Sequence, residues 1–132
     1  MGYVSPDFRR HPVANFIEPS LESHDRDNFE ITLFSDVEAR DLVTDRMEKM
    51  ADRWVQCAND SYDEVYRKVR AHEIDILVEL AGHTARNRLP TLLQRAAPVQ
   101  VTYLGYPNTI GIPQLDYLIT DAIVDPPGEE RL

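Results

Sequence analysis

The hydrophobic positions of the chain follow two alternating spacings, and the shorter spacing marks the strands. Residues 74–80 form a mostly apolar, β-branched run that stops at Gly82, which is typical of a strand buried on both faces. Residues 29–34 alternate apolar and polar side chains, which also indicates a strand. The predicted strands are 3–5, 29–34, 74–80, 98–104 and 117–120, with a short edge strand at 53–56.

Between these runs, apolar residues recur every three or four positions, as on the buried face of a helix. The first helix is predicted to begin at Pro12 and to kink or end at Pro19, because proline fits a first turn and disrupts a helix interior. The second helix follows an apolar stripe made of Val43, Met47, Met50 and Trp54.

Two further helices have clear signals at their starts. Ser61 and Glu64 form a capping box, which predicts a helix that continues to His72. The last helix covers residues 86–97, with Pro90 in its first turn. Because strands and helices alternate, we expect a mostly parallel sheet covered by helices on both faces.

Composition narrows the class of protein. The 132 residues suit one domain, and 42% hydrophobic with 28% charged residues is ordinary for a folded globular chain. The net charge of -9 disfavours non-specific nucleic-acid binding and does not favour an anionic membrane surface. Neither a nucleic acid nor a membrane is therefore expected as a partner. The single cysteine, Cys57, indicates a reducing cytosol and hence a cytoplasmic protein.

Three loops follow three predicted strands, at residues 6–11, 81–84 and 105–111. If the strands are parallel, these loops gather at one edge of the sheet, outside the carboxyl ends of the strands, where ligands bind in open α/β sheets. His11 and His83 lie in two of the loops. The sequence therefore predicts a candidate site at this edge.

Each of these residues also has a purely structural interpretation. His11 precedes a helix start, where the dipole disfavours an imidazolium and free amides attract anions, but it can equally bond its own backbone. His83 can be a plain turn residue, and Gly105 and Gly111 can serve positive φ angles or a closely approaching ligand. Neither GxGxxG nor GxxxxGK[ST] occurs, so no dinucleotide or P-loop site is predicted.

Three separated motifs resemble one known family. They are GYVSPDFRRHP at 2–12, IDILVELAGHT at 74–84 and APVQVTYLGYP at 97–107, and LDYLITD at 115–121 also fits. Together they resemble the O-linked N-acetylglucosaminyltransferase family, in its bacterial, SPINDLY-like branch. The resemblance implies a Rossmann-like three-layer α/β/α lobe with a mostly parallel sheet, the N-terminal lobe of a GT-B fold. Residues 1–125 would form this lobe, and residues 126–132 would begin a linker.

The resemblance also implies a domain organisation and a reaction. Members have tetratricopeptide (TPR) repeats followed by two catalytic lobes, so a C-terminal lobe that holds most of the nucleotide-sugar pocket would be missing from this chain. The implied reaction is inverting transfer of a sugar from UDP-GlcNAc or a related nucleotide sugar to Ser or Thr hydroxyls of an acceptor protein or peptide. The resemblance implies no cofactor and no metal, and we expect the isolated chain to be inactive. The alternative is a non-catalytic, flavodoxin-like binding or regulatory module.

The resemblance also implies roles for individual residues. His11 matches the family's His-Pro histidine, which has been proposed as the catalytic base. The implied substrate-binding residues are Leu104, Gly105, Tyr106, Pro107, Thr109 and His83. The chain departs from the family at Asn108, where glycine is usual, although asparagine tolerates positive φ better than most residues.

Overall fold

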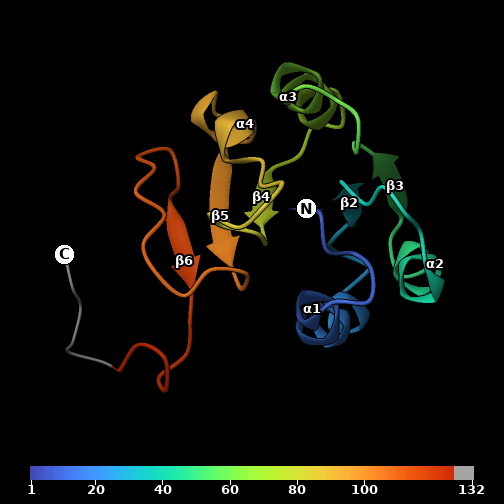
Figure 1. Cartoon of the computed structure of the whole chain (residues 1–132), viewed down its shortest axis with the longest axis horizontal. Helices are drawn as coiled ribbons and strands as arrows, with labels where there is room; N and C mark the ends of the chain where they lie inside the picture. Colours follow the sequence, from blue (N-terminus) through green and yellow to red (C-terminus); the bar gives the residue numbers. More distant parts are fainter. Residues whose placement is uncertain (127–132) are drawn as a thin grey trace.

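A single sheet of six parallel strands forms the centre of the computed structural model, which describes residues 1–126 (Figure 1). The strands lie in the order β3-β2-β1-β4-β5-β6. Their bounds are β1 Gly2–Ser5, β2 Thr32–Ser35, β3 Arg53–Gln56, β4 Ile76–Glu79, β5 Val99–Tyr103 and β6 Tyr117–Ile119. All five neighbouring pairs are parallel, so the predicted parallel sheet is confirmed.

The chain begins in the middle of the sheet and fills it in two passes. It first runs outward from β1 to β3, then crosses back to β4 and runs outward to β6. This doubly wound order reverses between β1 and β4, and such a reversal opens a crevice at the carboxyl ends of the strands. Because β1, β4 and β5 are consecutive in the sheet, the loops after Ser5, Glu79 and Tyr103 leave the same edge.

Four helices cover the two faces of the sheet and make three layers. The helices are α1 Pro12–Ser23, α2 Leu42–Glu48, α3 Tyr62–Ala71 and α4 Leu89–Leu93. Figure 1 shows α1 and α2 below the sheet and α3 and α4 above it. The capping box at Ser61 and Glu64 is present at the start of α3, and Pro90 lies in the first turn of α4, as predicted.

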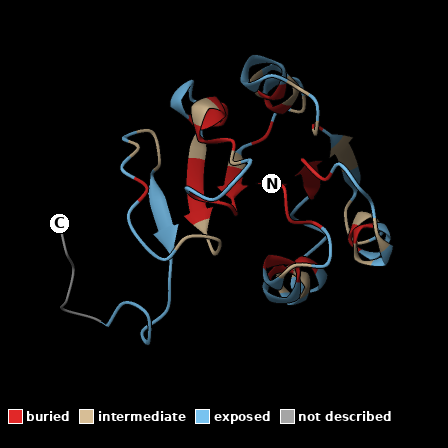
Figure 2. Cartoon of the chain, in the orientation of Figure 1, coloured by how far each residue is buried: buried red, intermediate tan, exposed pale blue. Residues whose placement is uncertain are grey.

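Each face of the sheet has its own hydrophobic core. Leu33 packs with Ile17 and Met47 in the core under α1 and α2, whereas Phe34 packs with Val65 in the core under α3 and α4. Consecutive strand residues point to opposite faces, which is why Leu33 and Phe34 serve different cores. Figure 2 shows the central strands buried and β6 exposed along its length.

Two helix predictions differ from the structure. The helix predicted from Val43 to Trp54 ends at Glu48, and Trp54 lies on β3, the edge strand that was also predicted. Trp54 nevertheless packs against the same core as Met47. Its spacing from Met47 therefore matched a helical stripe even though Trp54 lies on a strand. The last helix is also shorter than residues 86–97, because only Leu89–Leu93 is helical.

Pro19 does not end α1, which continues to Ser23. Proline leaves the carbonyl four residues earlier without its helical partner, here that of Asn15. Both Pro19 and Asn15 lie on the exposed side of the helix, where water can bond the carbonyl. Ile17 and Leu21 hold the opposite side in the core, so burial outweighs the lost hydrogen bond.

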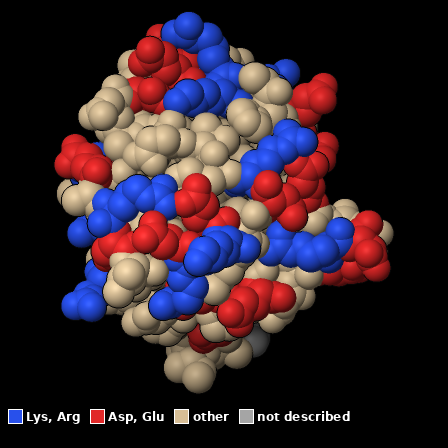
Figure 3. All heavy atoms as spheres, turned by 90° about the vertical axis from the view of Figure 1, so that its right-hand side faces the viewer, with Lys and Arg blue, Asp and Glu red and all other residues tan. Residues whose placement is uncertain are grey.

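Most charged side chains lie at the surface, and Asp7, Asp36, Glu79 and Arg88 are buried exceptions. On the face that Figure 3 shows, cationic and anionic side chains are interspersed and form no continuous basic patch. Within residues 1–126, no helix is long and apolar enough to cross a membrane. The linker predicted to begin at residue 126 lies almost wholly outside the described residues.

Candidate active site

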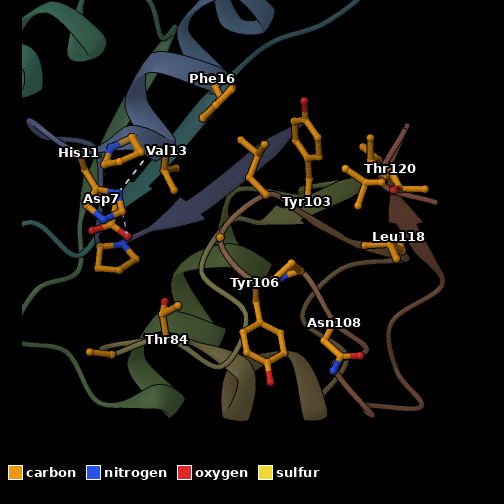
Figure 4. A pocket seen from close by; sticks show the side chains of 18 of the residues that line it. Asp7, His11, Val13, Phe16, Thr84, Tyr103, Tyr106, Asn108, Leu118 and Thr120 are labelled. Carbon is orange, nitrogen blue, oxygen red and sulfur yellow. Dashed lines mark hydrogen bonds and ion pairs between the residues drawn. The ribbon is translucent and has the colours of Figure 1, made fainter. Parts of the chain in front are cut away.

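A cavity of about 700 Å³ opens at the carboxyl edge of the sheet. Its walls come from four segments that follow β1, β4, β5 and β6, so residues from both ends of the chain meet there (Figure 4). Of the residues predicted for the site, the cavity is lined by His11, Leu104, Gly105, Tyr106 and Pro107. Asn108, at the position where the family usually has glycine, lines it too.

His11 is the N-cap residue of α1, and its extended backbone lets Pro12 begin the helix. The His11 Nδ1 accepts a hydrogen bond from the Val13 N–H at 3.3 Å, as Figure 4 shows, so the ring does bond its own backbone. The same Nδ1 lies 3.6 Å from Asp7 Oδ2. A ring nitrogen that accepts a hydrogen bond has no proton, so a neutral His11 ring in this arrangement carries its proton on Nε2.

Asp7 is the acidic neighbour of His11, and the sequence analysis did not single it out. Its side chain is only 9% exposed and pairs with Arg9 at 3.3 Å, while its own N–H donates to Ser5 Oγ at 3.0 Å. The spacing of four residues between Asp7 and His11 within one loop was the signal available in the sequence. A carboxylate beside an imidazole can select which ring nitrogen holds the proton.

The wall formed by residues 103–108 depends on an unusual backbone. Leu104 and Gly105 both have positive φ, at 59° and 51°. A Cβ on Gly105 would lie 2.1 Å from the Leu80 carbonyl oxygen, so Gly105 serves both its own φ and a close approach to Leu80, the residue after β4. Gly111 has φ 68° with nothing within 4 Å of an added Cβ, so only its conformation requires glycine.

His83 and Thr109 are not among the residues that line the cavity. The His83 Nε2 instead lies 2.8 Å from the Ile110 carbonyl oxygen, and its ring packs edge-on against Tyr106. The Thr109 N–H donates to the Asn108 side chain at 2.8 Å. The structure therefore places these two predicted substrate-binding residues, both exposed to solvent, outside the lining of the cavity.

Further lining residues come from elements that sequence reasoning did not connect with the site. They are Val13, Phe16, Tyr103, Leu118, Ile119 and Thr120, among others. Leu118, Ile119 and Thr120 lie at the end of β6, and the predicted strand at 117–120 was a usable signal for them, since its carboxyl end reaches the same edge. Phe16 is 64% exposed and lies on α1 one turn beyond the His11 cap.

Two buried carboxylates lie behind this edge. Asp36 follows β2 and pairs with Arg88, and Glu79 ends β4 and accepts hydrogen bonds from the N–H groups of Ala81 and Gly82. Burial raises the pKa of Asp36 and of Glu79, although these partners oppose the rise. Among residues 1–126, no three His, Cys, Asp or Glu side chains come together as metal ligands would.

Fold and cavity define a doubly wound α/β domain with an open cavity at its switch edge, the arrangement in which such domains bind ligands. Comparison with known families then identifies the group. Glycosyl transferase family 41 matches residues 1–130. The chain belongs to glycosyl transferase family 41, and the family resemblance found in the sequence is confirmed.

Individual relatives are similar to nearly the whole chain. Proteins named "Probable UDP-N-acetylglucosamine--peptide N-acetylglucosaminyltransferase SPINDLY" from Solanum lycopersicum and Arabidopsis thaliana are 44% and 45% identical over 99% of it. A Caenorhabditis elegans UDP-N-acetylglucosamine--peptide N-acetylglucosaminyltransferase is 32% identical over 96%. The chain spans only 14%, 15% and 11% of these three proteins.

A solved structure is similar as well. The structure of a Thermobaculum terrenum O-GlcNAc transferase mutant matches 91% of this chain with a TM-score of 0.88 and 42% identity. The match covers 23% of that protein. This similarity confirms the predicted fold class, a Rossmann-like α/β/α lobe of the GT-B type.

Proposed function

We propose that this chain is the N-terminal catalytic lobe of a protein O-GlcNAc transferase-like enzyme. The enzyme would transfer a sugar, with inversion, from UDP-GlcNAc or a related nucleotide sugar to Ser or Thr hydroxyls of proteins. One observation carries the proposal: segments from three family-like motifs, which begin at residues 2, 74 and 97, line a single cavity. Family membership along almost the whole chain supports it.

The proposed chemistry is a direct displacement. The acceptor hydroxyl oxygen forms a bond to the anomeric carbon while the bond from that carbon to the diphosphate breaks and its electron pair leaves with UDP. The hydroxyl proton passes to a base. Backbone amides and cations stabilise the charge that develops on the leaving group, and this is the largest electrostatic demand of such a step.

His11 is the proposed base, and this role requires a particular ring nitrogen to carry the proton. Nε2 can take a proton only when it has a free lone pair, which places the proton of a neutral ring on Nδ1. Nδ1 would then donate to Asp7 Oδ2, now 3.6 Å away, instead of accepting from Val13. We assign Asp7 to this orienting role, in the manner of a base held by a carboxylate.

The remaining parts of the enzyme are proposed from the relatives' length, of which this chain spans 11% to 15% in the three named above. We propose that a second α/β lobe supplies most of the nucleotide pocket, that TPR repeats precede the catalytic region, and that the protein works in the cytoplasm. Metal and cofactor are not required by this mechanism. The isolated 132-residue chain is expected to show no transfer. Turnover of UDP-GlcNAc by this chain alone would contradict that expectation.

The test uses the full-length parent protein with His11→Asn, assayed with UDP-GlcNAc and other nucleotide sugars. Asparagine is itself a good N-cap, so α1 should keep its start while the base is lost. We expect kcat to fall by about 10²- to 10⁴-fold, the usual contribution of a general base. The matched control is His72→Asn, at the end of α3 and outside the cavity, which should leave kcat unchanged.

A wild-type parent that transfers no sugar from any donor would favour the non-catalytic binding module. If the wild type is active and His11→Asn is equally active, the lobe assignment stands and the role of His11 as base fails. The donor panel also identifies the sugar, because GlcNAc and fucose donors differ in both sugar and nucleotide.

A further inference from the structure

We propose that His83 is a positioning residue that latches the segment 104–111 onto the turn after β4 and thereby sets one wall of the cavity. The proposal rests on the proposed function, since the wall matters only if the cavity binds substrate. It differs from the substrate contact that the family resemblance implied for His83. The contact with the sugar would be made by the latched segment, and His83 would act through it.

The latch itself is a hydrogen bond between residues 27 positions apart in the chain. His83 Nε2 lies 2.8 Å from the Ile110 carbonyl oxygen. A carbonyl oxygen can only accept, so Nε2 carries the proton and donates. The imidazole also packs edge-on against Tyr106, with ring centroids 5.2 Å apart and planes at 77°. Tyr106 lines the cavity and His83 does not, so the imidazole contacts the wall through Tyr106.

Two glycines let the two segments approach closely enough for this contact. A Cβ on Gly82 would lie 2.2 Å from the Tyr106 Cβ, and one on Gly105 would lie 2.1 Å from the Leu80 carbonyl oxygen. Each segment therefore uses a glycine where the other segment presses against it. The contact is a fitted interface between two turns, and a side chain at either glycine would separate them.

The turn that carries His83 is held by hydrogen bonds of its own, which do not involve the segment 104–111. The buried Glu79 carboxylate accepts from the Ala81 N–H at 2.6 Å and from the Gly82 N–H at 2.8 Å. Thr84 Oγ1 donates to the Ala81 carbonyl at 2.7 Å. Gly82 has φ 56°, which turns the chain sharply before His83. This hydrogen-bonded turn holds the His83 imidazole toward Ile110.

The first measurement is on the 132-residue chain and needs no activity. Long-range ¹H–¹⁵N NMR should find the His83 ring proton on Nε2. Thermolysin, which cuts before Ile110, should cleave His83→Ala about tenfold faster than wild type, since one net hydrogen bond contributes about that factor. His83→Gln, whose amide can donate to the same carbonyl, should be cleaved nearly as slowly as wild type. The control is Asn87→Ala, whose side chain bonds the Thr84 carbonyl and the Leu89 N–H and makes no hydrogen bond to the segment 104–111.

The second measurement is on the full-length parent. For His83→Ala we expect KM to rise about tenfold with a smaller fall in kcat, and His83→Gln to return KM to within about threefold of wild type. If His83→Gln is as impaired as His83→Ala while thermolysin cleavage stays slow, the imidazole itself contacts substrate and the proposal fails. A proton on Nδ1 alone would overturn it as well. An inactive wild-type parent would refute the proposed function, and NMR and proteolysis would still decide whether the latch exists.

Discussion

Replacing Arg88 by methionine removes the cation of a buried ion pair. The Asp36 side chain is 1% exposed and that of Arg88 10%. Arg88 Nε and Nη2 donate to the two oxygens of Asp36, each at 2.5 Å, and its remaining N–H groups reach the carbonyls of Cys57 at 2.8 Å and Asp60 at 2.9 Å. One guanidinium thus joins the connections after β2 and β3 to the start of α4.

The expected loss of folding stability is about 3–5 kcal/mol at pH 7, because methionine leaves the Asp36 charge buried without a partner. The side chain of methionine fills most of the space, so the cavity term is small beside the charge term. A domain of this size has about 5–15 kcal/mol in total, so Arg88→Met is expected to be partly unfolded or close to it at 37 °C.

The loss should depend on pH with a definite sign. Burial already raises the pKa of Asp36 above 3.8, so the folded state keeps this proton to higher pH than the unfolded state does. The free energy of unfolding therefore falls as pH rises from the unfolded-state pKa of Asp36 to its folded-state pKa. Removing Arg88 removes the hydrogen bonds and the nearest positive charge that oppose the rise, although Arg86 remains, so the pKa of Asp36 rises further and the penalty grows with pH. The penalty is smallest below the unfolded pKa, where Asp36 is protonated in both states.

Urea unfolding followed by circular dichroism at pH 4 and pH 7 measures both effects. The matched control is Arg53→Met, which breaks an ion pair with Glu30 whose two side chains are 52% and 55% exposed and should cost less than about 1 kcal/mol. Adding Asp36→Asn to the Arg88 variant should recover part of the loss. A loss below about 1 kcal/mol at pH 7, or one that is no smaller at pH 4, would refute the reasoning.

Two further predictions concern single small residues. Gly105→Ala should cost about 2 kcal/mol or more of folding stability, because φ is 51° and the added Cβ would meet the Leu80 carbonyl. Gly111→Ala should cost only about 1 kcal/mol, because only its φ is unfavourable, and comparable urea midpoints for the two variants would contradict this comparison. Burial raises the pKa of Cys57 to about 12, so Ellman's reagent at pH 8 should label it only at the rate of unfolding, and labelling of the folded chain within minutes would show the thiol to be accessible.

Local signals in the sequence were sufficient for most element starts. The capping box of Ser61 and Glu64 satisfies its own helix terminus, and Pro12 fits a first turn whatever packs on the helix. Such signals act over a few residues, so they can be read from the chain directly. Where an element ends depends on more distant packing. Trp54 shows this, because its spacing from Met47 fits a helix and its actual place is on β3 against the same core.

The sequence by itself determined the alternation of strands and helices, and with it a parallel sheet whose loops share one edge. It thereby placed His11 and the glycine-containing 105–111 segment near the same cleft. Only the tertiary structure decided which side chains within those loops face the cavity. Asp7 was brought beside His11, and His83 was turned toward Ile110. The reason is physical: a side chain's direction in a loop follows from positive φ angles and from contacts with segments far away along the chain, and neither leaves a periodic pattern in the sequence.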